Sequence, residues 1–174
     1  IADTGARRTL AGSAYNERRS QCEAAAASLG VASLRDASLD ILDAAGLDPL
    51  IDKRARHVIT ENDRVLQAEA ALRDGDLARM GQLMDASHAS LRDLYEVSSM
   101  ELDTMVELLR CQPGCYGARL SGAGFGGCAV ALMDAGAVQA AIPEVAAAYQ
   151  ARVQLDPALY PTRAAAGASF SHDF

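Results

Sequence analysis

Apolar residues recur at helical spacing through the first part of the chain. In one segment they follow one another at intervals of three, four and seven residues, at Leu77, Met80, Met84, Leu91 and Leu94. A shorter run with the same spacing lies at Leu102, Met105, Val106 and Leu109. Side chains three and four positions apart share one face of an α-helix, so each run predicts an amphipathic helix with one buried face.

Residues that favour helix ends divide this part of the chain into five helices. Side chains able to cap a first turn stand at Ser13, Ser38, Asp48, Asp76 and Ser98, and glycines that favour a helix stop stand at Gly30, Gly46 and Gly75. Pro49 suits the first position of the helix after Asp48, and Glu101 completes a capping box with Ser98. We therefore predict a helix after each cap, the last of them ending before Pro113-Gly114.

The pattern changes after Pro113-Gly114. Residues 117–121 and 128–133 predict strands, and a glycine-rich run from Gly122 to Gly127 separates them. Residues 138–149 return to helical spacing, with Pro143 in an early turn or at a kink, and residues 159–165 predict a last extended segment. Helices followed by strands predict the α+β class, with a helix-rich N-terminal half and a small, largely antiparallel sheet.

Size and charge limit the class further. The 174 residues fit one domain, which we place at residues 1–168, followed by a tail at 169–174. The formal net charge of −7 argues against binding to nucleic acid or anionic membranes, because such binding draws on clustered Lys and Arg. No apolar stretch is long enough to span a bilayer and no signal segment opens the chain, which favours the cytoplasm. Residues 1–5 lack a Met and resemble the end of a strand, so we expect the cut end of something longer, with a processing boundary as the alternative.

The glycine-rich run matches G-x-G-x-x-G at Gly122, Gly124 and Gly127, which by itself is a weak signal. A dinucleotide-binding loop must open a helix, whereas residues 128–133 predict a strand. A protein-kinase loop and a Walker loop both require a lysine, and Lys53 is the only lysine in the chain. Two interpretations remain: a loop whose backbone amides bind an anion or another ligand, and a tight turn with a helix packed on it.

Other residues with reactive side chains have ordinary structural explanations. Cys111 and Cys115 are close in sequence, but neither His57 nor His88 stands at a ligand-like spacing from them, so we predict no metal site. We expect both histidines to take part in packing and in hydrogen bonds between helices, with a functional role as the alternative. Arg119, just before the glycine run, could face a phosphate or form an ion pair.

The segment Gly117-Ala-Arg-Leu-Ser-Gly-Ala-Gly-Phe-Gly-Gly-Cys128 resembles the third conserved motif of galactokinases, which belong to the GHMP small-molecule kinase family. Four further segments resemble galactokinase segments in the same order, at residues 13–19, 54–62, 84–92 and 95–103. Five ordered matches are far more specific than one glycine motif. The likeness reaches to about residue 168, and the chain is similar to the C-terminal domain of the family.

The resemblance implies the GHMP kinase C-terminal fold and a part in the ATP- and Mg²⁺-dependent phosphorylation of the galactose 1-hydroxyl. Galactose and ATP are then the ligands, and an N-terminal domain is the partner. Tyr15 matches a tyrosine that contacts the sugar, and an aromatic ring with a hydroxyl suits a sugar because it offers an apolar face and one hydrogen bond. The loop beside sugar and phosphates is matched by Gly122, Ala123, Gly124, Phe125, Gly126 and Gly127.

The family's G-L-S-S-S phosphate loop and the Asp and Arg that activate the sugar hydroxyl belong to its N-terminal domain, and no G-L-S-S-S run occurs in this chain. Phosphoryl transfer depends on positioning and charge stabilisation that those groups supply, so we assign no catalytic base here and expect the chain alone to be inactive. Two alternatives stay open: a galactokinase-like sensor that binds sugar and ATP without turnover, and a GHMP kinase for another sugar.

Overall fold

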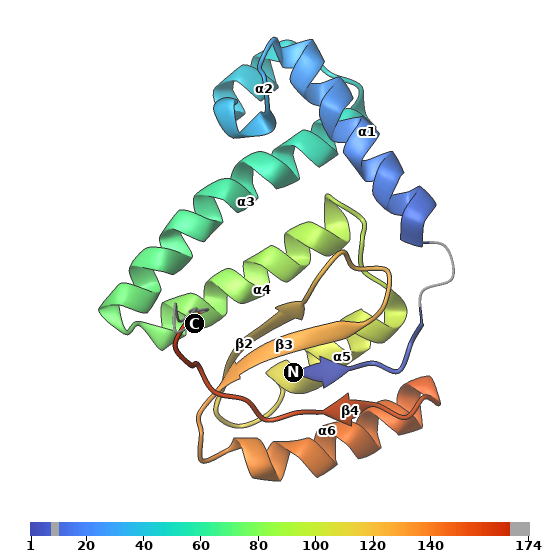
Figure 1. Ribbon diagram of the computed structural model, residues 1–174, viewed down its shortest axis with the longest axis vertical. Helices are drawn as coiled ribbons and strands as arrows, with labels where there is room; N and C mark the ends of the chain where they lie inside the picture. The colour runs from blue at the N-terminus through green and yellow to red at the C-terminus, as the bar shows by residue number, and fades with distance from the viewer. Residues whose placement is uncertain (8–10, 168–174) are drawn as a thin grey trace, which may run out of the picture.

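The computed structural model describes residues 1–7 and 11–167, and Figure 1 shows that they form two regions. The body is a small sheet packed on helices α4 (Leu77–Asp93), α5 (Met100–Arg110) and α6 (Val138–Val153). The arm consists of helices α1 (Ala11–Leu29), α2 (Leu39–Ala45) and α3 (Pro49–Asp74), with a short 3₁₀ turn, η1 (Leu34–Asp36). Helix α3 packs along α4, so these two helices join the arm to the body.

Four antiparallel strands form the sheet: β1 (Ala2–Asp3), β2 (Cys115–Leu120), β3 (Cys128–Met133) and β4 (Ala158–Leu159). Their order across the sheet is β2-β3-β1-β4. Leu120 pairs with Ala129 in the β2-β3 hairpin, and Ala2 of β1 pairs with both Ala129 and Leu159. The predicted α+β class with a small antiparallel sheet is confirmed, although β4 is shorter than the extended segment expected at 159–165.

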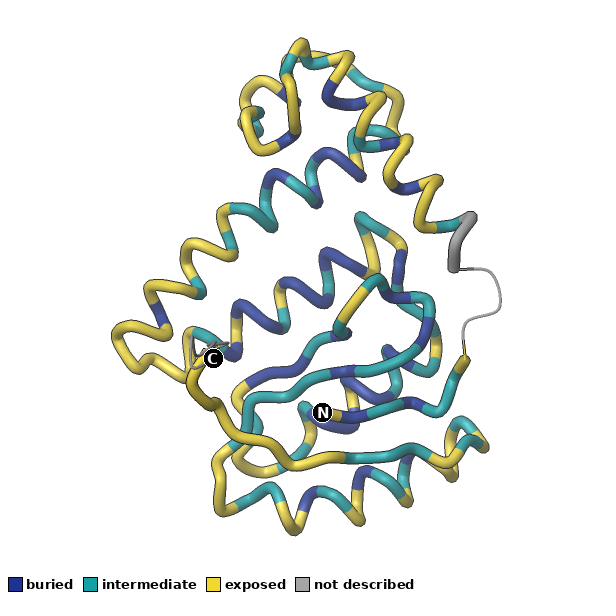
Figure 2. Tube along the Cα trace, in the orientation of Figure 1, coloured by how far each residue is buried: buried dark blue, intermediate teal, exposed yellow. Residues whose placement is uncertain are grey.

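The body and the arm each have a hydrophobic core. In the body, α5 and α6 bury their apolar faces against the sheet, and Met105, Val106 and Tyr149 are almost fully inaccessible. The arm core is smaller, and alanines, such as Ala25 and Ala55, are prominent in it. Figure 2 shows buried positions through the body and on the inner sides of the arm helices, while the C-terminal half of α3 is largely exposed.

A pair of glycines brings α4 into direct backbone contact with β2. A Cβ atom at Gly81 would lie 1.9 Å from the carbonyl oxygen of Tyr116, and one at Gly117 would lie 2.1 Å from the carbonyl oxygen of Gly81. No side chain fits at either position unless the backbone moves. This contact sets the distance between α4 and the sheet, and therefore where the loop after β2 begins.

Most predicted helix ends are confirmed because they rest on local hydrogen bonds. Ser38, Asp48 and Asp76 each accept a hydrogen bond from a first-turn amide of the helix that follows. Gly46 and Gly75 end their helices in the left-handed conformation, which glycine adopts at no steric cost. The local sequence therefore determines where α2, α3 and α4 begin and where the first two of them end.

Three predictions were wrong in detail. Helix α1 begins at Ala11, so Ser13 lies inside the helix and not at its N-cap. The N-cap of α5 is Ser99 and not Ser98. Leu77, assigned to a buried face, is 40% exposed because it opens α4 at the edge of the body. The tail predicted at 169–174 lies outside the described residues. Among the helices that the structure describes, none is both long enough and apolar enough to cross a membrane.

Candidate functional site

The glycine loop, residues 122–127, lies in the connection between β2 and β3 at one end of the hairpin. Its backbone takes positive φ angles at Gly122 (78°), Gly124 (79°), Gly126 (122°) and Gly127 (85°), and also at Phe125 (60°). Only glycine adopts such angles routinely, so the backbone path by itself explains why these positions are glycine. Phe125 tolerates the strain because its side chain packs against the cluster around Leu120.

Two neighbouring segments fix the shape of the glycine loop. On one side the Phe125 amide donates to the carbonyl oxygen of Val97 at 2.6 Å, and a Cβ atom at Gly124 would lie 2.0 Å from that same oxygen. On the other side the Thr4 hydroxyl donates to the Gly127 carbonyl at 2.7 Å. The buried Tyr149 hydroxyl donates to the Thr4 carbonyl at 3.0 Å. Close packing on Val97 therefore requires glycine at position 124. That the glycine loop also contacts a ligand stays a prediction.

Tyr15 lies in the second turn of α1 and is 55% exposed. It stands at the rim of a cleft of about 650 Å³ between α1, η1 and α3. The cleft is lined by Tyr15, Arg19, Cys22, Glu23, Ala26, Ala27, Val31, Ala32, Ser33, Leu34, Arg35, Val58, Asn62 and Tyr95. Burial raises the pKa of the Cys22 thiol, so this side chain stays protonated and apolar in character. An exposed aromatic ring with a free edge is the feature that a sugar contact requires.

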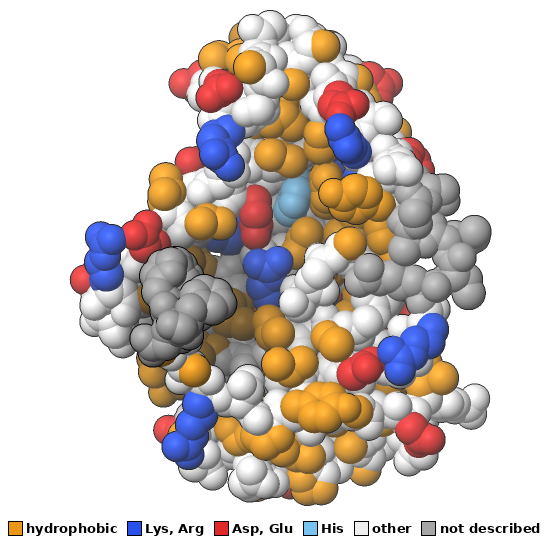
Figure 3. Space-filling view, in the orientation of Figure 1, with side chains coloured by type: hydrophobic (Ala, Val, Ile, Leu, Met, Phe, Trp, Pro, Cys, Tyr) orange, Lys and Arg blue, Asp and Glu red, His pale blue; other side chains and the backbone are white. Residues whose placement is uncertain are grey.

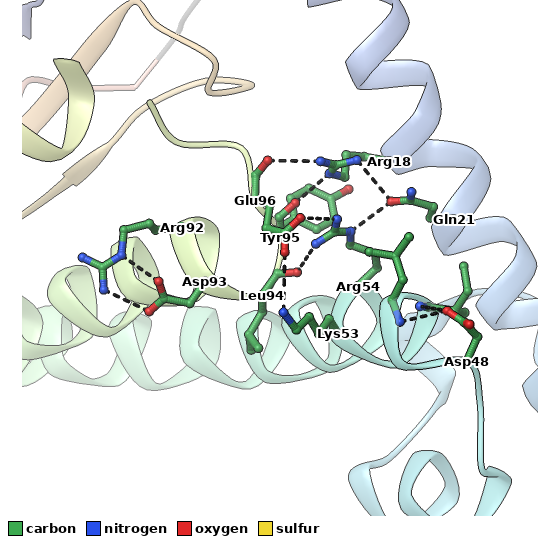
Figure 4. Close-up of polar contacts among 12 residues, drawn as sticks. Arg18, Gln21, Asp48, Lys53, Arg54, Arg92, Asp93, Leu94, Tyr95 and Glu96 are labelled. Carbon is green, nitrogen blue, oxygen red and sulfur yellow. Dashed lines mark hydrogen bonds and ion pairs between the residues drawn. The ribbon is translucent and has the colours of Figure 1, made fainter. Parts of the chain in front are cut away.

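A short connector, residues 94–97, forms the first part of the link between α4 and α5. Side chains of the arm bind it, as Figure 4 shows, and the glycine loop binds it through the Phe125 amide. Arg54 of α3 is 1% exposed and donates to the Gln21 side chain at 2.9 Å and to the Glu96 carboxylate at 2.7 Å. Arg18 of α1 donates to the carbonyl oxygen of Tyr95 at 2.7 Å. The sequence singled out neither arginine, because the partners that they bind on other elements lie 33 to 78 residues away.

Both histidines that drew attention in the sequence have packing roles. His57 forms a hydrogen bond with Ser90 at 2.8 Å and stacks on Tyr95, with the ring centroids 4.4 Å apart. Burial lowers its pKa to about 4, so it is neutral at pH 7. His88, 1% exposed, accepts the Leu120 amide at Nδ1 and faces the Asp103 carboxylate through Nε2 at 3.2 Å. Burial outweighs that carboxylate and lowers the pKa of His88.

Arg119 forms an ion pair and does not stand free for a phosphate in this structure. Its guanidinium lies 3.7 Å from Glu61 of α3, and its Nε donates to the Leu120 carbonyl at 3.0 Å. Ser87 and Arg64 also bind the Glu61 carboxylate. Figure 3 shows charged side chains in a hollow between arm and body, with hydrophobic side chains over the adjoining sheet face. The ion-pair interpretation of Arg119 is the one that the geometry supports.

The described residues offer no ligand set for a metal ion. No group of three or more His, Cys, Asp or Glu side chains within 1–7 and 11–167 is placed to hold one. Cys111 is exposed and Cys115 is half-buried, and both are free.

The structure brings the two sequence-predicted elements, Tyr15 and the glycine loop, to the same connector. Arg18, one turn after Tyr15 on α1, binds the connector at Tyr95, and Phe125 of the loop binds it at Val97. Side chains from the arm and main-chain groups from the body thus meet at residues 94–97. Chemically, the arrangement presents an exposed aromatic hydroxyl and a glycine-rich backbone turn, both suited to a small polar ligand.

Comparisons with known proteins identify relatives of this chain. Residues 68–151 match the family model described as GHMP kinases C terminal. The chain is also similar to a crystal structure of Lactococcus lactis galactokinase complexed with galactose, with 39% sequence identity and a TM-score of 0.87. That match covers 91% of this chain and 43% of the galactokinase chain, so the chain spans less than half the length of this relative. The family model and the structural match together show that the chain belongs to the GHMP kinase family and corresponds to its C-terminal domain.

Proposed function

We propose that this chain is the C-terminal part of a galactokinase, which transfers the γ-phosphoryl group of ATP to the 1-hydroxyl of galactose. The observation that carries the proposal is the 39% identity to a galactokinase over 91% of this chain. In the reaction a new bond forms between the sugar 1-oxygen and the γ-phosphorus, and the bond from that phosphorus to the β,γ-bridging oxygen breaks. The hydroxyl proton goes to a base that we place outside these residues.

In this proposal the chain binds and orients its ligands, and does not supply the reacting groups. Tyr15 contacts the sugar, because its exposed aromatic ring offers an apolar face and a hydroxyl for one hydrogen bond. The glycine loop, Gly122 to Gly127, lies beside the sugar and the phosphates. Phosphoryl transfer is accelerated chiefly by positioning and by stabilising charge, so a rigid binding surface is a real contribution to the rate. ATP is the co-substrate, and Mg²⁺ accompanies it with ligands from elsewhere in the enzyme.

The proposal also includes a second domain and a location. The serine-rich phosphate loop and the residues that activate the sugar hydroxyl would belong to an N-terminal domain that closes on this one. Support comes from the galactokinase match, of which this chain covers 43%. We place the enzyme in the cytoplasm, where ATP is available.

Galactose-dependent ADP formation by the full-length gene product tests the proposal. We expect ADP and galactose 1-phosphate in equal amounts, and no ADP from the isolated 174-residue chain. A sugar panel run in parallel separates the alternatives. Turnover of a different sugar alone would replace galactokinase with another GHMP kinase activity. Binding of galactose and ATP without turnover would replace it with the sensor function.

A further inference from the structure

We infer that Arg18 and Arg54 are positioning residues that hold Tyr15 and the glycine loop in one fixed arrangement through the connector, residues 94–97. The inference rests on the proposed function, in which Tyr15 and the loop contact the ligands. Neither arginine needs to touch a ligand. Each acts on the connector, and the connector acts on the two binding elements.

The connector presents four consecutive carbonyl oxygens, and every one accepts a hydrogen bond from another part of the molecule. Arg54 donates to the carbonyl of Leu94 at 2.5 Å. Arg18 donates to the carbonyls of Tyr95, at 2.7 Å, and Glu96, at 3.2 Å. The last carbonyl, that of Val97, accepts the Phe125 amide of the glycine loop. The amides of Leu94, Tyr95 and Val97 bond back to carbonyls of α4, so the donors to the carbonyls fix the other side of the connector.

The first three of these bonds join the arm to the body. Arg54 belongs to α3 and Arg18 to α1, while the connector belongs to the body. The Gln21 side-chain oxygen accepts from both arginines, at 3.3 Å from Arg18 and 2.9 Å from Arg54, so the two act as one unit. Tyr15 lies one helical turn before Arg18 on α1. A shift of Arg18 relative to the connector therefore moves Tyr15 relative to the glycine loop.

Glu96 shows why the connector needs this support. Its φ of 53° lies in the left-handed region, which is unfavourable for a residue with a side chain. Its carboxylate pairs with Arg54 at 2.7 Å and with Lys53 at 3.6 Å, and the Arg54 guanidinium lowers the pKa of that carboxyl. Figure 4 shows both arginines converging on this segment from two helices. Without them, the connector has a strained residue and unpartnered carbonyls.

The residue type fits the task. Arg54 uses three separate nitrogens to reach Gln21, Leu94 and Glu96, which are partners on different elements. A guanidinium can do this because its donors point in fixed, divergent directions, whereas the ammonium of lysine is a single point on a flexible stem. Lysine at this position would keep the charge and one of the contacts. We therefore expect the connector to be held most firmly with arginine at position 54, less firmly with lysine, and least firmly with methionine.

Amide hydrogen exchange in the ligand-free full-length gene product tests the inference. The reporter is the Phe125 amide, and the reference is the amide of Val106 in the α5 core. We expect Arg54→Met to speed exchange at Phe125 about tenfold with less than a twofold change at Val106, and Arg54→Lys to give an intermediate value. Arg56→Met is the matched control, since Arg56 lies on the same helix and pairs with Asp43 and Asp52 away from the connector. It should change neither rate.

If Arg54→Met does not fold, Arg18→Gln tests the inference in its place. Arg18 is closer to the surface than Arg54, and its loss leaves the Arg54 contacts intact. We expect Phe125 exchange to rise about fivefold in this variant. Equal acceleration at Phe125 and Val106, or none at Phe125 in Arg18→Gln, would overturn the inference. The exchange readout needs no substrate. A wild-type protein that forms no ADP with galactose would refute the proposed function while leaving this result intact.

Discussion

The body and the arm hold their parts of the site by different means. In the body, the glycine loop is fixed by close packing: Gly81 and Gly117 set the helix against the sheet, and Val97 contacts the loop backbone. In the arm, Tyr15 is fixed through side-chain hydrogen bonds, from Arg18 and Arg54 to the connector. Packing faults in the body should therefore affect folding as a whole, whereas faults at the polar junction should affect the relative placement of the two binding elements.

The largest effect is expected from Gly81→Ala, which disrupts the close packing of α4 on β2 in the body. The new methyl group would lie 1.9 Å from the Tyr116 carbonyl oxygen, so α4 and β2 must separate. Overpacking against backbone costs about 3 kcal/mol or more of unfolding free energy, measured by urea denaturation. Gly136→Ala is the control, because its Cβ would meet only the end of the Asp134 side chain, at 3.3 Å. A stable Gly81→Ala protein would show that α4 does not depend on this contact.

A matched pair of leucine truncations compares the two regions directly. Leu102 of the body, in the cluster around Leu120, is 0% exposed, and Leu42 of the arm core is 1% exposed. Leu102→Ala should lower the global unfolding free energy by about 3 kcal/mol, the usual cost of a cavity. Leu42→Ala should instead speed hydrogen exchange in α1, α2 and α3 and leave the α5 amides protected. Loss of protection across both regions in each variant would mean that arm and body unfold as one unit.

Acid should weaken the junction between the regions. His57 lies on α3, and its ring is buried against Tyr95. This burial lowers the pKa of His57 in the folded chain to about 4, below the ordinary value of 6.5. The stabilisation that the neutral His57 ring gives the folded chain is therefore complete above about pH 6.5 and is lost as the pH falls toward 4. We expect the unfolding free energy to drop by about 2 kcal/mol from this group between pH 7 and pH 5.

The variant His57→Asn measures this contribution. The asparagine amide can take the position of Nδ1 opposite Ser90 but does not titrate. The fall in stability between pH 7 and pH 5 should be smaller in the variant than in the wild type, and the remaining fall belongs in part to His88, whose pKa burial also lowers. Parallel stability curves for the two proteins would contradict a neutral, buried His57.

The smallest effect is expected from Tyr15→Phe in the full-length gene product. Tyr15 is 55% exposed, so loss of its hydroxyl should leave the unfolding free energy unchanged within about 0.5 kcal/mol. Under the proposed function it should raise the galactose KM several-fold, worth about 1 kcal/mol for one lost hydrogen bond, and change the ATP KM less. Tyr160→Phe is the control, because Tyr160 is 57% exposed and follows β4 directly. Equal changes in both KM values would remove the case for a sugar contact.

Local features of the molecule could be predicted from the sequence, and long-range ones could not. The caps at Ser38, Asp48 and Asp76 depend on residues within three positions, and all three are confirmed. The capping box of Ser98 and Glu101 predicted the wrong serine, because a pattern of residue types does not fix the register of the first turn, and the N-cap is Ser99. The ordered motifs also predicted the family, because the same residue types recur at the same positions of a known fold.

The contacts that shape the candidate site join residues far apart in sequence. Arg54 and Leu94 lie 40 residues apart, and Arg18 and Glu96 lie 78 apart. No periodicity links such pairs, and a buried arginine is chemically indistinguishable in sequence from an exposed one. The glycine loop is the reverse case. Its position was predicted, yet the close approach of the Val97 carbonyl to Gly124 was not, because the sequence alone does not place the two side by side.

A crystal structure of the full-length gene product with galactose tests the central claim most directly. The claim is that the arm and the body present Tyr15 and the glycine loop to one sugar. We predict the sugar within hydrogen-bond distance of the Tyr15 hydroxyl, with residues 122–127 beside it and the four connector carbonyls bonded as described. Galactose bound elsewhere, with Tyr15 still open to solvent, would contradict the account.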